Sequence, residues 1–135
     1  MEKIYETKFN IIYFDSEKEL LKMVRYDATR DMSEHDYKTD MLKLKDLVIE
    51  KNAKYALIDN RELHFVLSPD VQDWANKEVV APAFQHFLGK VAFIEGANLF
   101  ANISSQQAIE DNEEKQAHFR FFDNEEEAMK WLLAF

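Results

Sequence analysis

The residues best suited to chemistry follow a short apolar run in the middle of the chain. The run is Tyr55–Ile58, and the polar side chains directly after it are Asp59, Asn60, Arg61, Glu62 and His64. An Asp–His pair can orient a general base, whereas an aspartate at a strand end usually accepts hydrogen bonds from the amides of the next turn. We expect the turn role for Asp59, because no paired nucleophile, glycine-rich phosphate loop or nucleophile elbow accompanies it. An enzyme that uses Asp59 and His64 remains an alternative.

The four histidines show no metal-binding spacing. They are His35, His64, His86 and His118, and no two stand four residues apart as on a zinc-protease helix. Isolated histidines are seldom metal ligands. We therefore expect no metal site and no cofactor.

Ser68 stands directly before Pro69 and has two interpretations. A serine at the N-cap followed by a proline at the first helical position is a strong helix start. A phosphorylated serine at the same place would set a dianion against the positive end of the helix dipole. The cap alone explains the residue, so we expect Ser68 to be an N-cap.

Composition excludes several classes of function. The chain has 135 residues, the size of one domain, and 26 acidic against 17 basic residues give a net charge of −9. The basic residues are scattered, so we expect no nucleic-acid partner. There are no cysteines, which excludes disulfides and thiolate chemistry and fits a reducing cytoplasm. Met1–Asn10 has no signal-peptide core and no apolar run approaches the ~20 residues of a membrane span, so we expect a soluble cytoplasmic protein.

Strand-like runs alternate with helical segments, which predicts an α/β fold in a single domain over residues 1–135. Ile4–Phe14 and Leu20–Tyr26 are rich in β-branched and aromatic residues and flank the turn-forming residues Asp15–Lys18. They predict an antiparallel hairpin or meander, although Leu20–Met23 could also begin a helix. Short apolar runs buried on both faces are typical of parallel strands; they are Tyr55–Ile58, Val91–Ile94 and Phe119–Phe122.

Two helices have clear capping signals. Ser33 and Asp36 form a variant of the capping box and predict a helix over Glu34–Glu50. Its buried stripe should include Tyr37, Met41, Leu44 and Val48, with Asp40 among the residues off the stripe. Asp123 or Asn124 should cap a last helix that packs its apolar side, including Trp131, and docks the chain end at Phe135.

The segment between the first two parallel strands predicts a helix from Pro69 that kinks or splits near Pro82. Proline disfavours helical geometry at the preceding residue, Ala81, so a second short helix should continue to about Leu88. Ser104–Gln116 is acidic and predicts a weak helix or a loop.

Burial can be predicted for the strands and for the central connection. The residues expected in the core are Leu57, Ile58, Phe93, Ile94 and Trp131. After Asp59, we expect Arg61 and His64 to be substantially exposed and without a local structural role. Leu63 or Phe65 should then anchor the connection to the core.

Four stretches resemble the SpoIIAA-like group of small bacterial proteins, which is related to STAS domains. They cover nearly the whole chain and are NIIYFDSEKELLKMVRYDATRDMSEHDY, YALIDNRELHFVLSPDVQDW, KVAFIEG and FRFFDNEEEAMKWL. The resemblance implies a strand–helix superhelix on a mostly parallel mixed sheet. The N-terminal hairpin or meander would supply the antiparallel part.

The resemblance also implies a role in protein binding. In the related anti-sigma-factor antagonists, a partner kinase phosphorylates a loop serine, and counting from Asp59 places that serine at Ser68. The motif here is Leu67-Ser68-Pro69-Asp70, without the preceding Asp, the second Ser and the Gly of that loop. The fold is also similar to SEC14-type domains, which carry an apolar ligand.

We therefore expect a non-enzymatic protein-binding or regulatory module, and a homodimer is compatible with this expectation. The candidate partner- or ligand-binding residues are Asp59, Asn60, Arg61, His64 and Ser68. A small apolar-ligand or lipid binder of the SEC14 type is the first alternative, and a closed aromatic cavity near Trp74 would favour it. The enzyme is the second alternative, and a hydrogen bond between Asp59 and His64 beside a cleft would favour it.

Overall fold

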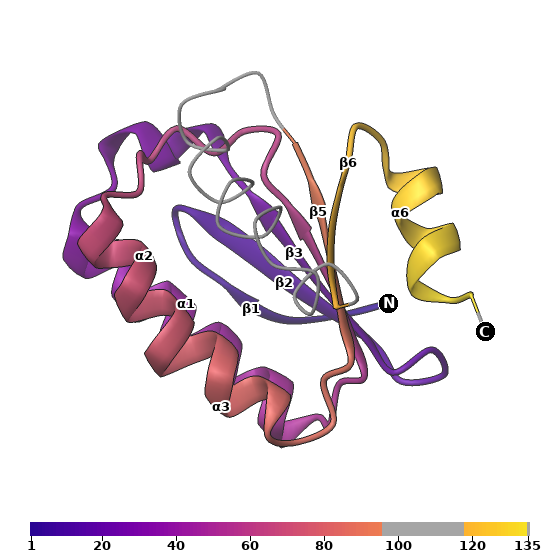
Figure 1. The fold of residues 1–135 in the computed structure, drawn as a ribbon. Helices are drawn as coiled ribbons and strands as arrows, with labels where there is room; N and C mark the ends of the chain where they lie inside the picture. Colours follow the sequence, from indigo (N-terminus) through magenta and orange to yellow (C-terminus); the bar gives the residue numbers. More distant parts are fainter. Residues whose placement is uncertain (96–117, 135) are drawn as a thin grey trace.

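The computed structural model describes residues 1–95 and 118–134, which contain a six-stranded mixed sheet (Figure 1). The strands lie in sequence order, and β1, β2 and β3 pair antiparallel whereas β3, β4, β5 and β6 pair parallel. Their bounds are β1 Glu2–Glu6, β2 Asn10–Asp15, β3 Leu20–Arg25, β4 Tyr55–Asp59, β5 Lys90–Ile94 and β6 Phe119–Phe122. The predicted α/β fold with an antiparallel N-terminal meander is confirmed. Ser104–Gln116 and Phe135 lie outside the described residues.

Two side chains shape the turns of the meander in the same way. Thr7 Oγ1 accepts hydrogen bonds from the backbone N–H groups two and three residues later, at 3.1 and 3.3 Å. Asp15 Oδ1 accepts the equivalent two bonds in the next turn, at 3.1 and 3.2 Å. Such bonds satisfy amides that strand pairing leaves free. The run Ile4–Phe14 therefore contains parts of two strands, and Leu20–Arg25 is a strand rather than the start of a helix.

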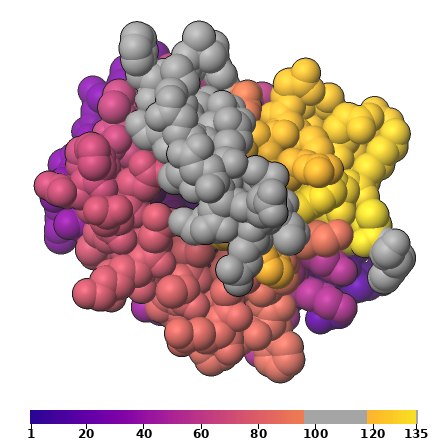
Figure 2. Space-filling view, in the orientation of Figure 1, coloured from indigo at the N-terminus to yellow at the C-terminus, as the bar shows by residue number. Residues whose placement is uncertain are grey.

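Helices cover both faces of the sheet (Figure 1). The helices α1 (Glu34–Glu50), α2 (Pro69–Ala75) and α3 (Ala81–Phe84) lie on one face, and α6 (Glu125–Leu132) lies on the other. Figure 2 shows the outer surface of α6 in yellow, apart from the rose-to-salmon surface of α2 and α3. A large core fills the space between α1, α3 and the sheet, and a smaller core lies between α6 and strands β3, β4 and β5. None of the helices described is long and apolar enough to cross a bilayer.

Both ends of α1 follow local sequence signals, and its predicted bounds are confirmed. The backbone N–H of Asp36 donates to Ser33 Oγ at 3.1 Å, and the backbone N–H of Ser33 donates to Asp36 Oδ2 at 3.0 Å. At the other end, Asn52 adopts φ 53° and the N–H of Ala53 donates to the carbonyl of Val48 at 3.0 Å. Asparagine tolerates this left-handed geometry better than most residues, so it can reverse the chain after a helix.

Pro82 widens the second helical segment instead of splitting it. Ala81 keeps helical angles of −59° and −49°, contrary to the sequence expectation, and its N–H donates to the carbonyl of Asn76 five residues earlier. The turn η2 (Asn76–Val80) is accordingly π-helical. Proline has no N–H and its ring crowds the carbonyl four residues before it, so a wider turn accommodates the ring without ending the helix. Helix α3 then ends before the expected limit at Leu88.

The predicted core is confirmed for three of the five residues and only partly confirmed for the other two. Leu57, Ile58 and Ile94 are buried, whereas Phe93 and Trp131 are only partly buried. Trp131 lies at the margin of the smaller core, where Lys90 Nζ stands 5.1 Å from the centre of its ring. At this margin, part of the Trp131 ring stays in contact with water. A smaller side chain next to it on α6 fills the inside of the smaller core.

That neighbouring side chain is Leu132, which is fully buried. Leu132→Ala should lower the free energy of unfolding by about 2–5 kcal/mol, because it removes apolar contacts and leaves a cavity under α6. Urea denaturation followed by circular dichroism measures the difference. Glu126→Ala, on the exposed side of the same helix, should stay within about 0.5 kcal/mol of the parent. A Leu132→Ala variant as stable as Glu126→Ala would contradict the packing of α6.

Candidate functional site

The candidate site lies where β3 and β4 end at the same edge of the sheet. The two strands are parallel, and Val24 of β3 is in register with Asp59 of β4. The turn η1 (Asp27–Asp31) follows β3, and residues Asn60–Ser68, here called the β4–α2 connection, follow β4. Binding sites of α/β proteins commonly form at the carboxyl edge of the parallel strands.

Asp59 is held by the residue that we expected to be free. The Asp59 side chain is only 6% exposed, and Arg61 Nη2 donates to Asp59 Oδ2 at 2.6 Å while Arg61 Nε donates to Oδ1 at 3.0 Å. The backbone N–H of Arg61 also donates to Oδ1, at 3.1 Å, which confirms the turn role of Asp59. Burial acts to raise the pKa of Asp59, but the bonds from Arg61 and the charge of Lys22 hold that pKa below its usual value. The expectation that Arg61 has no structural role is therefore wrong, although its side chain is 51% exposed.

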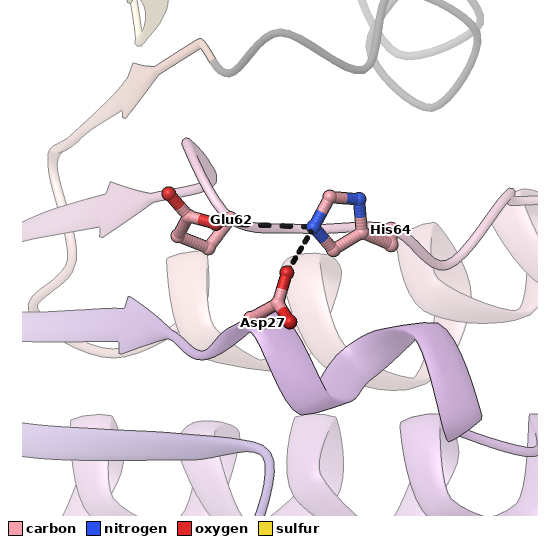
Figure 3. Close-up of side chains that lie close together, drawn as sticks. All are labelled: Asp27, Glu62 and His64. Carbon is pink, nitrogen blue, oxygen red and sulfur yellow. Dashed lines mark hydrogen bonds and ion pairs between the residues drawn. The ribbon is translucent and has the colours of Figure 1, made fainter.

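His64 faces two carboxylates from two different connections (Figure 3). Its Nε2 atom lies 2.9 Å from Asp27 Oδ1 and 3.8 Å from Glu62 Oε2. Arg30 Nη2 donates to the same Asp27 oxygen at 2.6 Å and is the main reason why the pKa of Asp27 lies below its usual value. These contacts leave only 30% of the His64 side chain exposed, which is less than expected.

The backbone that carries Glu62 and His64 is fixed by a buried threonine. Thr29 of η1 is fully buried; its hydroxyl donates to the carbonyl of Glu62 at 3.0 Å and accepts from the backbone N–H of His64 at 3.0 Å. Leu63 is buried between them, and the Phe65 ring stacks on another aromatic ring 5.0 Å away. The expected anchoring of the connection is thus confirmed for both Leu63 and Phe65.

Asn60 and Ser68 mark the two ends of the connection. The backbone N–H of Asn60 donates to the carbonyl of Ile94 at 2.9 Å, so Asn60 continues the link between β4 and β5. Ser68 Oγ accepts from the backbone N–H of Val71 at 3.2 Å and caps α2, as predicted. Both residues have structural roles at these positions.

Asp59 and His64 do not form a catalytic pair. Asp59 is bonded to Arg61, and His64 is bonded to Asp27. Asp59 is therefore not the residue that orients the His64 ring. The hydrogen bond between Asp59 and His64 that would favour the enzyme alternative is therefore not formed.

Sequence reasoning missed Asp27 and Thr29, which complete the site. Both come shortly after β3, and their importance depends on the pairing of β3 with β4. The signal was the similarity of two largely apolar runs, Leu20–Val24 and Tyr55–Ile58, each followed within a few residues by acidic side chains. Aligning these runs as parallel neighbours would have placed Asp27 beside the β4–α2 connection.

A buried polar cluster beneath α1 was also missed. Asp40 is buried, contrary to the expectation that it lies off the buried stripe, and burial raises its pKa. Arg25 is buried near it, donates to Asn10 Oδ1 at 2.9 Å and stands 5.6 Å from the centre of the Tyr37 ring. Burial lowers the pKa of Arg25, and the attraction between the opposite charges offsets part of that effect. Its enclosed position gives this cluster a role in holding α1 on the sheet.

An apolar cavity of about 70 Å³ lies between α1, η2, α3 and the sheet, among side chains that include Val79, Phe84 and Phe93. Trp74, near which an aromatic cavity was considered, is not in its lining. A cavity of roughly 150 Å³ is needed to hold a molecule the size of benzene. The cavity is therefore too small for a lipid chain.

Comparisons with known proteins leave the chain without an assigned family. No protein-family model matches it, and neither a curated protein nor a solved structure matches it. The similarity to SpoIIAA-like proteins thus stays an interpretation of the sequence.

The Asp59–Arg61 pair yields a prediction with a matched control. Arg61→Ala should lower the free energy of unfolding by about 1–2 kcal/mol near neutral pH, because it leaves a buried carboxylate without its guanidinium partner. The loss stays modest because about half of the Arg61 side chain is in contact with water in the parent, which weakens the ion pair. The lowered pKa of Asp59 stabilises the fold above the unfolded value of about 3.9, and this contribution disappears as the pH falls through the folded pKa. The difference between parent and variant should accordingly shrink toward about pH 3.

Arg30→Ala is the control, since Arg30 and Arg61 each lie 2.6 Å from a carboxylate oxygen. Both side chains of the Arg30–Asp27 pair are exposed, so losing this pair should change the free energy of unfolding little. Urea denaturation of both variants at the two pH values tests the comparison. Equal losses for the two variants would show that the burial of Asp59 contributes nothing.

Proposed function

We propose that the chain is a non-enzymatic cytoplasmic module that binds a protein partner through the β4–α2 connection. The observation that carries this proposal is the exposure of Val66, whose surface is 58% accessible in the middle of a connection that is otherwise held firmly. Thr29, Leu63 and Phe65 fix the residues before it, and Ser68 caps α2 two residues after it. A rigid loop that exposes an apolar side chain and also carries charged side chains resembles a small protein-binding surface, in which an apolar centre has a polar rim.

The charges on the β4–α2 connection and on η1 indicate the chemistry of the partner. Asp27 and Glu62 are exposed and negative, while the charge of Arg61 is largely neutralised by Asp59. A partner that offers a basic group toward Glu62 and an apolar pocket for Val66 would complement this surface. The net charge of −9 would attract such a partner from a distance.

The resemblance to SpoIIAA-like and STAS-related proteins supports the same proposal. The order of elements, an antiparallel meander followed by alternating helices and parallel strands, agrees with what that resemblance implies. Under this proposal Ser68 acts as the cap of α2 rather than as a phosphoacceptor, because its hydroxyl oxygen already accepts from Val71. A regulatory module of this kind would act through the exposed part of the connection.

Among residues 1–95 and 118–134, neither alternative function has a supporting observation of its own. The apolar-ligand alternative needs a cavity several times larger than about 70 Å³. The enzyme alternative needs Asp59 and His64 together, and they have separate partners. Protein binding is therefore the function best supported.

Val66→Asp tests the proposal. The partner is first recovered by affinity capture with the parent chain, and its affinity for each variant is then measured by calorimetry. Val66→Asp should weaken binding at least about ten-fold, or ~1.4 kcal/mol, because it places a charge in an apolar contact. It should change stability by no more than about 0.5 kcal/mol, since the residue is exposed.

Phe87→Asp is the matched control, because Phe87 is equally apolar and exposed but precedes β5 at the opposite edge of the sheet. It should leave binding unchanged. If Phe87→Asp abolishes binding and Val66→Asp does not, the surface is at the other edge. If the partner is a second copy of the chain, sedimentation should show a dimer that Val66→Asp dissociates.

A further inference from the structure

We propose that Asp27, Glu62 and His64 form a binding site for one divalent transition-metal ion of the Zn²⁺ type. This inference does not depend on the proposed function, because metal binding is measured on the isolated chain. It concerns the one group of three metal-ligating side chains that the described part of the chain brings together, with all three ligand atoms within 4.8 Å of one another (Figure 3).

The ligand types match the chemistry of such an ion. One imidazole nitrogen and two carboxylate oxygens are ligands that Zn²⁺ accepts, and three protein ligands leave a fourth position open for water or for a partner's side chain. Magnesium and calcium prefer oxygen ligands alone, so the histidine argues for a transition metal. The chain has no cysteine, so a thiolate site of higher affinity cannot compete for the ion.

The distances are close to those that a metal requires. Ligands about 2.1 Å from a tetrahedral ion stand roughly 3.4 Å from one another. His64 Nε2 lies 2.9 Å from Asp27 Oδ1 and 3.8 Å from Glu62 Oε2, so these two separations lie on either side of that value and within about half an ångström of it, and all three ligand atoms lie within 4.8 Å of one another. Glu62 and Asp27 have exposed side chains that can adjust, whereas His64 is the most enclosed of the three.

The electrostatic arrangement also favours a cation between these groups. Two carboxylates converge on the same nitrogen of His64. A divalent ion between the three groups would contact both carboxylates and the nitrogen at once.

The backbone of the site is arranged before any ion binds. Thr29 links η1, which carries Asp27, to the carbonyl of Glu62 and to the N–H of His64, and it is fully buried. A fixed backbone lowers the entropy that a metal site must lose on binding. The competing cation is Arg30, which contacts Asp27 through an exposed ion pair of the kind that contributes little.

The experiment is calorimetric titration of the tag-free chain with Zn²⁺ alone in a non-coordinating buffer. One ion should bind per chain, and His64→Ala should weaken that binding at least ten-fold, since even loss of a supporting residue weakens metal sites by roughly 10–100-fold. Glu62→Gln keeps the size of an exposed side chain and should weaken binding as well, so the test does not depend on one variant. His35→Ala, which removes an exposed histidine in the first turn of α1, should bind as the parent does.

Two further outcomes decide the proposal. The His64 ring signals in an NMR spectrum should shift on addition of one equivalent of Zn²⁺, whereas those of His35 should not. Absence of stoichiometric binding overturns the site. Binding that survives both His64→Ala and Glu62→Gln also overturns it, because the ion would then be held elsewhere.

Discussion

The parallel pairing of β3 with β4 is the constraint on which the rest of this structure depends. It joins the antiparallel meander to the parallel half of the sheet and aligns Val24 with Asp59. Both strands consequently end at one edge, where Thr29 can bond across to the β4–α2 connection. Asp27 and His64 meet there although 37 positions separate them in the sequence.

Two ion pairs at this edge show that the same contact distance contributes differently to stability when one carboxylate is buried. Arg61 and Arg30 each approach a carboxylate oxygen to 2.6 Å. Asp59 is enclosed, so its partner prevents an unpaired buried charge and becomes part of the fold. Asp27 is surrounded by water, so its pairing with Arg30 is weak and leaves the carboxylate available to another cation. Equal geometry thus gives a structural role to the Asp59–Arg61 pair and leaves the Asp27–Arg30 pair as a weak surface contact.

The polar residues beneath α1 show a different use of burial. Arg25 and Asp40 are both enclosed, and Arg25 is also bonded to Asn10 and lies against Tyr37. An apolar core can slide or repack at small cost, whereas moving buried polar groups away from their partners is expensive. We infer that this cluster fixes the position of α1 along the sheet, and with it the start of β4. The edge that carries the candidate site depends on that alignment.

The sequence by itself determined the local features of this protein. Ser33 with Asp36, Ser68 and Asn124 cap the helices as their neighbours in the chain indicated, and the apolar runs of β4 and β5 are buried strands. These features depend on residues a few positions apart, so short-range patterns are enough to predict them. The α/β class followed from the same alternation of elements.

Only the tertiary structure decided which distant residues meet. Arg61 became the partner of Asp59, Asp27 became the partner of His64, and Asp40 became enclosed in the core, where the charge of Arg25 acts on it. Each result depends on strand register and on helix position across the sheet, and neither is encoded in the residues adjacent to a side chain. Trp131 illustrates the same limit, because an apolar periodicity shows which side of a helix is buried but not how deeply each residue on it lies.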